Sequence, residues 1–555
     1  MNLSSQIRDT VKAGLNRRSV HRCSEWAQRY VSLGNPFPGP LSFKYHPWSK
    51  GMHDSEAPVN NGRKSAQAAY TQTVLHRTLF MMDVRRTDCL YVLPNKTPDA
   101  GDFSASRFDV LLELSDHLKK MFSDVKNVGH KRAGPTSLYI RGSHSESGLR
   151  SLPVGFMVLD EYDAMDQVNA KFAIERMSGQ MQKQVWKIST PTIPNWGIDK
   201  EVQISTEQRY FFKCPMCSRH TELLFPDCFV CPTESLTDPK IHESFIQCKE
   251  CTKPLDHRNK HIWLADKTMG GTGDWQIVNK KDPEVLAWSV NQLYSSTISP
   301  VEFARGYISG LSDPTEETHF YNNKLGLAHL VKGAQVSDDD IVKCQESYRN
   351  DCAINTAKIR TLGVDVGTWL HFIIYEWDVV LGPDINTHSR PKMIRAGKVK
   401  DFEDLDLLMQ VYQIHGCVID KFPEPRKAKE FADRFNGFVK LCYYSRGVAT
   451  KGITVRGEDD LYEDHQINVD RTSWLDLTLG RLQRQTVRIP YDLPDEYRNH
   501  VKALVRIYEK NPEGNPIGRW QNTSADHYAH AMNYSEIALP LAASVATNSN
   551  IGSFL

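Results

Sequence analysis

Residues Phe156-Met157-Val158-Leu159-Asp160-Glu161 guide the interpretation of this chain, because an apolar run is followed at once by two carboxylates. A short apolar run of this kind is typical of a buried strand. In a parallel sheet the carboxyl end of such a strand opens on the crevice where α/β proteins bind ligands. There Asp160 would hold a phosphate-bound Mg²⁺ and Glu161 would activate the attacking water, as in P-loop ATPases. The alternative is a strand that ends by chance in two surface acids.

Further apolar runs surround this stretch and extend the same pattern. Residues 89–94, 137–140 and 185–189 are expected strands, and residues 103–122 have helical periodicity. Strands that alternate with helices predict an α/β unit with a mostly parallel sheet. Beyond residue 266 the pattern favours helices to about Gly333.

The size and composition of the chain exclude several classes of protein. Its 555 residues are too many for one ordinary core, so two or three domains are expected. An apolar content of 40% and a charged content of 24% are those of a folded protein and not of a disordered one. We find no membrane-spanning stretch and no signal-peptide pattern, which favours an intracellular protein. The net charge of +1 does not single out a nucleic-acid binder, although basic residues can be confined to a channel.

A phosphate-binding loop is expected upstream, but the usual G-x-x-x-x-G-K-[ST] string is absent. In its place residues 63–71 read Arg-Lys-Ser-Ala-Gln-Ala-Ala-Tyr-Thr and precede a helical stretch, 72–80. This segment resembles the deviant Walker A motif of the large terminase subunits of lambda-like tailed phages, the gpA type. The resemblance implies that Lys64 reaches the β- and γ-phosphates and that Thr71 ligates Mg²⁺. Loop amides at a helix N-terminus would cradle the phosphates, and the loop also contains Ser65, Ala69 and Tyr70.

One position departs from the family pattern. The family usually has glycine where this chain has Ala69, because the backbone there approaches phosphate closely or takes a positive φ. Alanine would serve if the local dihedral angles were ordinary.

Three further features resemble terminase motifs and occur in the order that a RecA-like motor requires. Ser189-Thr190-Pro191-Thr192 resembles the coupling motif, in which Thr190 would sense the γ-phosphate. Arg150 precedes the Asp160 strand and would act as an arginine finger, with a solvated or structural arginine as the alternative. In the 43–48 segment, Tyr45 or Trp48 could stack on adenine or belong to the core.

Six of the twelve cysteines fall in three Cys-x-x-Cys pairs between Cys214 and Cys251, and this grouping indicates a metal. Four thiolates close a tetrahedral Zn²⁺ site with no open position, so the role would be structural. The middle pair, Cys228 and Cys231, could partner either outer pair, and free cysteines are the other alternative. The resemblance to lambda-like terminases implies the four outer ligands, Cys214, Cys217, Cys248 and Cys251.

The carboxy-terminal part has carboxylates at the ends of apolar runs. Asp365 lies in the run 362–367, Asp420 ends the run 416–420, and Asp526 lies at the start of a helical stretch. These positions match the three acids of the terminase nuclease, which resembles RNase H and cuts with two Mg²⁺ or Mn²⁺ ions. Each acid taken alone could be a turn residue or helix cap. The basic stretches 426–429 and 481–488 could line a DNA path or form solvated faces.

The resemblance implies a RecA-like P-loop ATPase domain with a zinc-binding insertion, followed by an RNase H-like α/β nuclease domain. The expected boundaries are 1–340 for the ATPase domain with its insertion at 205–266, 341–358 for a linker, 359–541 for the nuclease, and 542–555 for a flexible tail. It also implies a viral DNA-packaging motor in the host cell cytoplasm that uses ATP, Mg²⁺ and structural Zn²⁺. Its partners would be double-stranded viral DNA, a small terminase subunit and the portal protein, with a homo-oligomeric ring during packaging.

The sequence alone leaves two alternative functions open. One is a helicase-nuclease or transposition ATPase that works outside packaging. The other is a DNA-binding scaffold whose ATPase has lapsed, which Ala69 would explain.

Overall fold

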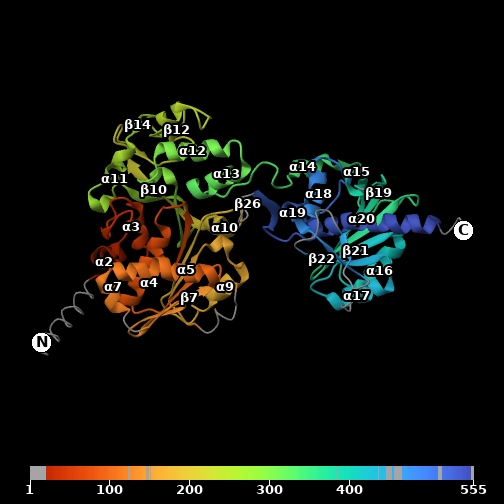
Figure 1. Ribbon diagram of the computed structural model, residues 1–555, viewed down its shortest axis with the longest axis horizontal. Helices are drawn as coiled ribbons and strands as arrows, with labels where there is room; N and C mark the ends of the chain where they lie inside the picture. Colours follow the sequence, from red (N-terminus) through yellow and green to blue (C-terminus); the bar gives the residue numbers. More distant parts are fainter. Residues whose placement is uncertain are drawn as a thin grey trace, which may run out of the picture. The chain divides into compact units, whose positions relative to one another are not determined.

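The chain forms two compact units, Met1–Leu330 (unit 1) and Val331–Leu555 (unit 2), in a computed structural model (Figure 1). The structure describes residues 20–122, 125–144, 149, 152–382, 384–435, 437–445, 453–455, 465–510 and 516–551. None of the helices described has the length and apolarity needed to cross a bilayer.

Unit 1 is built on an 11-stranded sheet whose centre is parallel. The strand order is β11-β10-β16-β3-β9-β8-β4-β7-β6-β5, with β15 paired to β10. The parallel strands are β10 (Ser205–Lys213), β16 (Asp282–Val290), β3 (Val59–Lys64), β9 (Gln184–Ser189), β8 (Phe156–Asp160), β4 (Cys89–Leu93) and β7 (Thr136–Gly142). The antiparallel edges are β5 (Val125–Asn127), β6 (His130–Ala133), β11 (His220–Thr221) and β15 (Asp274–Asn279).

Helices cover both faces of this sheet, which explains why β8 is an unbroken apolar run. Phe156 and Val158 pack in the larger core, whereas Met157 and Leu159 pack on the opposite face with α9. The helices of unit 1 are α2 (Cys23–Tyr30), α3 (Trp48–His53), α4 (Tyr70–Asp83), α5 (Gly101–Phe103), α6 (Val110–Leu114), α7 (Asp116–Met121), α9 (Gln167–Glu175), α10 (Gly197–Ile204), α11 (Lys260–Trp263), α12 (Pro300–Gly310) and α13 (Pro314–His319).

The cysteine-containing segment forms a small module between β10 and β15. Its three-stranded sheet consists of β12 (Phe229–Val230), β13 (Phe245–Gln247) and β14 (Pro254–Leu255). The module lies beside α12 at the end of unit 1 opposite β7 (Figure 1).

Two expectations for unit 1 change. Residues 205–213 are β10 of the main sheet, so the insertion begins at Cys214 and not at Ser205. Residues 274–279 and 282–290 are β15 and β16, where the sequence pattern favoured helices. Pairing with β10 and β3 decides these strands, and such long-range pairing overrides local periodicity.

Unit 2 contains a seven-stranded sheet in the order β20-β19-β18-β21-β22-β24-β23. β18 (Ile359–Val366), β19 (Leu370–Asp378) and β20 (Arg390–Val399) are antiparallel. β18, β21 (Gly416–Asp420), β22 (Val439–Tyr444) and β24 (Gln466–Val469) are parallel, and β23 (Ile453–Val455) is antiparallel to β24. An antiparallel hairpin followed by parallel strands in this order is the expected RNase H-like topology.

The helices of unit 2 also cover both faces of the sheet. α16 (Phe402–Val411) and α17 (Pro425–Arg434) pack on one face, and α18 (Arg471–Gln483) and α20 (His527–Ile551) pack on the other. The remaining elements include α14 (Asp338–Lys343), α15 (Ile385–His388), α19 (Asp495–Lys502), β17 (Gln345–Glu346), β25 (Ile489–Pro490), β26 (Leu504–Lys510) and β27 (Pro516–Asn522).

The backbone of the long helix α20 lies close to that of β18 at Gly363. A Cβ atom at Gly363 would collide with the carbonyl of Ala531 and the amide of Ser535. Glycine is therefore required at this crossing. Helix α20 continues to Ile551, so it includes residues 542–551 of the expected tail.

The junction between the units lies earlier than expected. The division falls after Leu330, and the expected linker 341–358 lies inside unit 2. A capping box at Ser337 and Asp340 begins α14 here, and Ile341 is buried in the core of unit 2.

Candidate functional site

A cavity of about 890 Å³ opens at the carboxyl ends of three adjacent parallel strands of unit 1. Lys64 ends β3, Glu161 directly follows β8, and Thr190 directly follows β9. All three line the cavity, together with the loop 33–42 and the helical residues 106–114. Its size is in the range of small-molecule sites.

The lysine and the acidic pair lie in direct contact. Lys64 Nζ is 2.9 Å from Asp160 Oδ1 and 2.6 Å from Glu161 Oε1. Tyr91 on β4 donates a hydrogen bond of 2.6 Å to the other oxygen of Asp160. Burial alone would lower the pKa of Lys64, but the two carboxylates reverse this effect and raise it. The lysine is therefore cationic and poised between the acids, and a phosphate would compete with them for it.

The loop between β3 and α4 takes the conformation for which the family uses glycine. Ala69 has φ 65° and ψ 16°, and Gln67 has φ 63°. Both values lie in the left-handed region that is costly for a residue with a Cβ atom. The dihedral angles of Ala69 are therefore not ordinary, and the loop accepts strain at this position.

Some side chains of the loop between β3 and α4 bond to the neighbouring strand, and others face the cavity. Ser65 Oγ donates to the carbonyl of Val290, and the buried Tyr70 hydroxyl donates to the carbonyl of Trp288. These two side chains fasten the loop to β16, so any phosphate contact from them would come from the backbone. Thr71 lies in the first turn of α4 among the cavity residues, as the ligand of a nucleotide-bound cation requires.

The aromatic segment before α3 supplies one cavity residue. Tyr45 lines the cavity and stacks on Phe37, with ring centroids 4.3 Å apart. Trp48 is buried, and its Nε1 donates to the carbonyl of Ala68 in the phosphate loop. Of the two aromatic residues considered for adenine stacking, only Tyr45 faces the cavity.

Asp163 joins the acidic loop to the expected coupling motif, and sequence reasoning missed it. Its Oδ2 accepts hydrogen bonds of 2.8 Å from both the amide and the hydroxyl of Thr192. Its Oδ1 accepts a 2.7 Å bond from the amide of Ile198 in α10. Gly197 has φ 49°, and a Cβ atom there would collide with this carboxylate. The spacing Asp160-x-x-Asp163 was the available signal. Arg150, the candidate arginine finger, lies outside the described residues.

The four outer cysteines come together and the middle pair does not join them. The sulfur atoms of Cys214, Cys217, Cys248 and Cys251 all lie within 4.8 Å of one another. The two pairs have matching turns, because the amides of Met216 and Glu250 each donate 3.3 Å bonds to the first sulfur of their pair. Four converging sulfurs that accept amide hydrogen bonds fit a tetrahedral Zn²⁺.

The third pair of cysteines has protein partners of its own. Cys228 is buried and its thiol donates to the carbonyl of Glu222, whereas the thiol of Cys231 donates to the carbonyl of Thr233. The choice between the pairs, which spacing left open, is made by how the module folds.

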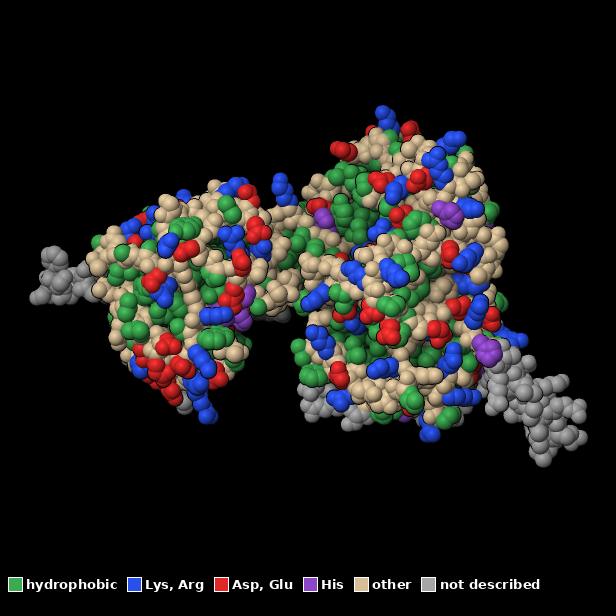
Figure 2. Space-filling view, turned by 180° about the vertical axis from the view of Figure 1, so that it is seen from behind, with side chains coloured by type: hydrophobic (Ala, Val, Ile, Leu, Met, Phe, Trp, Pro, Cys, Tyr) green, Lys and Arg blue, Asp and Glu red, His purple; other side chains and the backbone are tan. Residues whose placement is uncertain are grey.

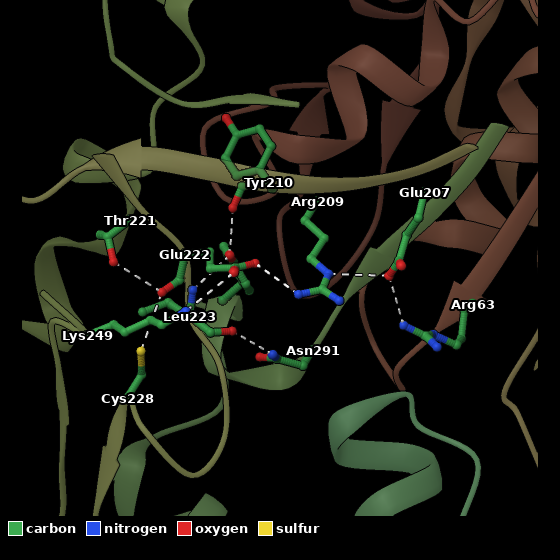
Figure 3. Close-up of polar contacts among 11 residues, drawn as sticks. Arg63, Glu207, Arg209, Tyr210, Thr221, Glu222, Leu223, Cys228, Lys249 and Asn291 are labelled. Atoms are coloured by element: carbon green, nitrogen blue, oxygen red, sulfur yellow. Dashed lines mark hydrogen bonds and ion pairs between the residues drawn. The ribbon is translucent and has the colours of Figure 1, made fainter. Parts of the chain in front are cut away.

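Ion pairs connect this module to the strand that carries the phosphate loop (Figure 3). Glu207 on β10 lies 3.2 Å from Arg63 on β3 and 3.3 Å from Arg209. Glu222 then lies between Arg209, at 3.6 Å, and Lys249 of the second cysteine pair, at 3.8 Å. The module is thus held against the main sheet by alternating charges.

The three acids of unit 2 come from two adjacent strands and from the residue before a helix that packs on both. Val364 on β18 pairs with Ile419 on β21, so Asp365 and Asp420 follow at the same level of adjacent strands. Asp526 directly precedes α20. Burial, followed by smaller effects that include the charge of Asp365, raises the pKa of Asp420 to about 6. A carboxylate destabilised in this way would be stabilised by a bound cation.

Histidines orient two of these acids. His527 Nδ1 is 2.8 Å from Asp365 Oδ2, and His530 Nε2 is 3.2 Å from Asp526 Oδ2. Burial raises the pKa of Asp526, but the His530 hydrogen bond and charge outweigh it and leave the pKa lowered. The two histidines thus position carboxylates. Among the described residues, the acids do not form a cluster as tight as that of the four cysteines.

The basic stretches of unit 2 differ in role. Arg481 is buried and forms an ion pair of 2.6 Å with the buried Glu536, so it does not face DNA. On α17, Lys429 pairs with Asp433 and Arg434 pairs with Asp406. Figure 2 shows Asp and Glu side chains gathered over the part of unit 2 that carries α16 and α17. This face is mixed in charge and does not form a basic path.

The fold and the cavity agree with a sequence match that covers most of unit 1. Residues 36–275 match the family described as phage terminase large subunit gpA, ATPase domain. Over these residues the chain belongs to the phage terminase large subunits. No curated protein sequence matches it significantly.

Several solved terminase structures are similar at low identity. The HK97 bacteriophage large terminase is 12% identical, with a TM-score of 0.49, covering 94% of this chain and 99% of that one. The large terminase ATPase domain of Thermus phage P74-26 is 11% identical, with a TM-score of 0.32, covering 51% and 92%. The large terminase nuclease of thermophilic phage G20c is 12% identical, with a TM-score of 0.23, covering 36% and 97%.

The family match bears on the role of unit 1, which contains the cavity. As a terminase large subunit, the chain is a DNA-packaging protein, and unit 1 carries its ATPase domain. The segment expected to form the phosphate loop, the acidic pair and the strand ending at Ser189 all lie inside the matched residues.

Proposed function

We propose that unit 1 hydrolyses ATP to drive double-stranded DNA into a procapsid, and that unit 2 cuts concatemeric viral DNA. The contact of Lys64 with Asp160 and Glu161, at the mouth of a cavity between parallel strand ends, supports the motor most directly. Glu161 would accept a proton from the attacking water, and Lys64 would bind the β- and γ-phosphates.

A magnesium ion bound with ATP would be held by Thr71 and Asp160, and it would offset phosphate charge. Asp160 is suited to this role because Tyr91 fixes the orientation of its carboxylate. Thr190 and Thr192 would sense the γ-phosphate, and Asp163 would pass a change in their position to α10.

In unit 2 two Mg²⁺ or Mn²⁺ ions would be held by Asp365, Asp420 and Asp526, and they would activate water for phosphodiester cleavage. His527 and His530 keep two of these carboxylates oriented through the contacts described above. In unit 1 a Zn²⁺ held by the four outer cysteines would be structural.

The expected partners are those of a packaging motor. We propose that the protein works in the host cell cytoplasm, assembles as a ring on the portal protein, and receives its DNA site from a small terminase subunit.

ATP turnover by the full chain, with and without linear duplex DNA, tests the motor. DNA-stimulated hydrolysis that is lost in Glu161→Ala is expected. Absence of hydrolysis in the parent protein would favour the DNA-binding scaffold instead. Stimulation by portal protein separates a terminase from a helicase-nuclease or a transposition ATPase.

The nuclease has a separate test. Nicking of supercoiled DNA in the presence of Mn²⁺ is expected from the full chain and should disappear in Asp365→Ala. Nicking that survives this substitution would remove Asp365 from the proposed site.

A further inference from the structure

Arg107 is a cationic residue of the nucleotide cavity that no motif assigns. It lies in the π-helical turn Ser104–Asp109, its side chain is exposed, and it lines the same cavity as Lys64 and Glu161. Among the described residues that line this cavity, Lys64 and Arg107 are the only lysine or arginine.

The charge of Lys64 is already compensated inside the site. It contacts both Asp160 and Glu161, so these three groups together carry one net negative charge. The histidines of the cavity do not add positive charge, because burial lowers the pKa of His46 and of His53 to about 4. Burial likewise lowers the pKa of His76 well below its usual range. Arg107 is thus the one cation of the cavity wall without an ion pair among the described residues.

The turn that carries Arg107 is fixed near the acidic pair. Phe103 stacks on Tyr91, with ring centroids 4.3 Å apart, and Tyr91 is hydrogen-bonded to Asp160. On the other side of Arg107, Phe108 is fully buried, and Asp109 pairs with Lys131 at 2.9 Å. Burial and the charge of Asp160 raise the pKa of Tyr91, and the charge of Arg107 opposes them. The backbone is thus held at both ends of the turn while the guanidinium is left to the cavity.

We propose that Arg107 is a further catalytic residue of the ATPase reaction, and that it acts within its own subunit to neutralise charge on the transferring phosphoryl group. This inference rests on the proposed ATPase function of unit 1. In the reaction a water oxygen bonds to the γ-phosphorus and the bond from that phosphorus to the bridging oxygen breaks. The electron pair stays on ADP and the water proton passes to Glu161. Arg107 donates hydrogen bonds to the γ-phosphoryl oxygens and is itself unchanged.

Steady-state ATP hydrolysis by the full chain tests this role, with Arg107→Ala and Arg107→Gln compared with Arg305→Ala. Arg305 is an exposed arginine on α12 that does not line the cavity, so it is a matched control. We expect kcat to fall about 100-fold or more in both Arg107 variants. KM for ATP and Kd for ADP should change less than about threefold, and thermal unfolding should match that of the parent.

Three outcomes would overturn the proposal. An unchanged kcat would remove Arg107 from the reaction. A rise in KM alone would make it a ground-state binding residue. Loss of DNA stimulation with normal basal hydrolysis would assign it to DNA. If the parent protein itself shows no hydrolysis, the proposed function fails, and this result is distinct from all three.

Mixing two inactive variants tests whether the arginine acts within its own subunit. Arg107→Ala and Glu161→Ala are combined in equal amounts under packaging conditions. We expect no recovery, because each subunit then lacks one group of its own site. Recovery of hydrolysis would show that Arg107 serves a neighbouring subunit and would overturn the proposal.

Discussion

Ala69 holds a left-handed backbone conformation at the N-terminus of α4, and this makes a prediction with a definite sign. Ala69→Gly should raise the free energy of unfolding by roughly 1 kcal/mol, because glycine relieves the cost of a Cβ atom at positive φ. Ala68→Gly, one residue earlier and without positive φ, should instead lower it by about 0.5–1 kcal/mol. Urea unfolding of both variants measures the difference. Destabilisation of equal size in both would show that the Ala69 conformation is not strained.

The raised pKa of the single residue Asp420 predicts that Mn²⁺ binding depends on pH. Burial, with a smaller effect from Asp365, raises its pKa to about 6, and only the carboxylate form can bind a cation. As pH falls through 6 a growing fraction of Asp420 is protonated, so Mn²⁺ affinity should fall with it. We expect the Mn²⁺ concentration for half-maximal nicking to rise between pH 7.5 and 5.5, and saturating Mn²⁺ to restore the rate. A loss of rate that no Mn²⁺ concentration restores would contradict this assignment.

Individual site residues were predictable where they directly follow or end an apolar run that forms a strand. Lys64, Asp160 and Glu161 could be placed in one site because strand ends of a parallel sheet meet at one edge. Arg107 could not, because an arginine in a polar segment has no distinctive pattern, and for Asp163 the only signal was its spacing of three residues from Asp160. Only the contacts of Asp163 with Thr192 and Ile198 reveal its position.

At the scale of elements, Asp163 holds the turn after β8, the turn after β9 and the start of α10 together. Asp163→Asn leaves one amide group facing backbone N–H donors, so it should cost about 1–3 kcal/mol of unfolding free energy. Asp166→Asn is the control, because Asp166 caps α9 and asparagine caps equally well. Urea unfolding distinguishes the two. Equal, small effects would show that this carboxylate does not fasten the three elements.

The cysteine module gives a prediction about metal content. The purified protein should hold one zinc per chain, and Cys248→Ser should lose it and become sensitive to proteolysis in the module. Cys231→Ser should keep the zinc, because Cys231 lies outside the four-cysteine cluster. Elemental analysis and limited trypsin digestion measure both properties. Zinc lost from Cys231→Ser but retained in Cys248→Ser would reverse the ligand assignment.

Elements with continuous apolar runs, such as β4, β8, β9 and β18, were predicted close to their observed bounds. The strands β15 and β16 were missed because their sequences are mixed, and residues at the start of β16 are exposed. Their strand conformation depends on β10 and β3, which are distant in sequence. The four cysteines that cluster were predictable only with the terminase resemblance, since spacing alone allowed other pairs.

At the scale of the whole molecule, each unit has its own hydrophobic cores. The core of unit 1 contains residues such as Trp26 and Trp186, whereas the cores of unit 2 contain Trp377 and Trp474. We expect residues 1–330 and 331–555, expressed separately, each to unfold cooperatively. Chemical denaturation followed by circular dichroism measures this. A fragment ending at residue 358 should gain no stability over 1–330, because residues 331–358 belong to unit 2. A clear gain would place the boundary later.

The close crossing of α20 over β18 at Gly363 also sets when the proposed nuclease centre can form during translation. Asp365 emerges from the ribosome early in unit 2, but Asp526 and the helix that seats against Gly363 emerge more than 150 residues later. At a synthesis rate of about 5–20 residues per second this delay lasts roughly ten to thirty seconds. A nascent chain can therefore complete the ATPase fold while it still lacks a cutting centre. If Asp526 belongs to the site as proposed, polypeptides that terminate before residue 526 would be unable to cleave DNA.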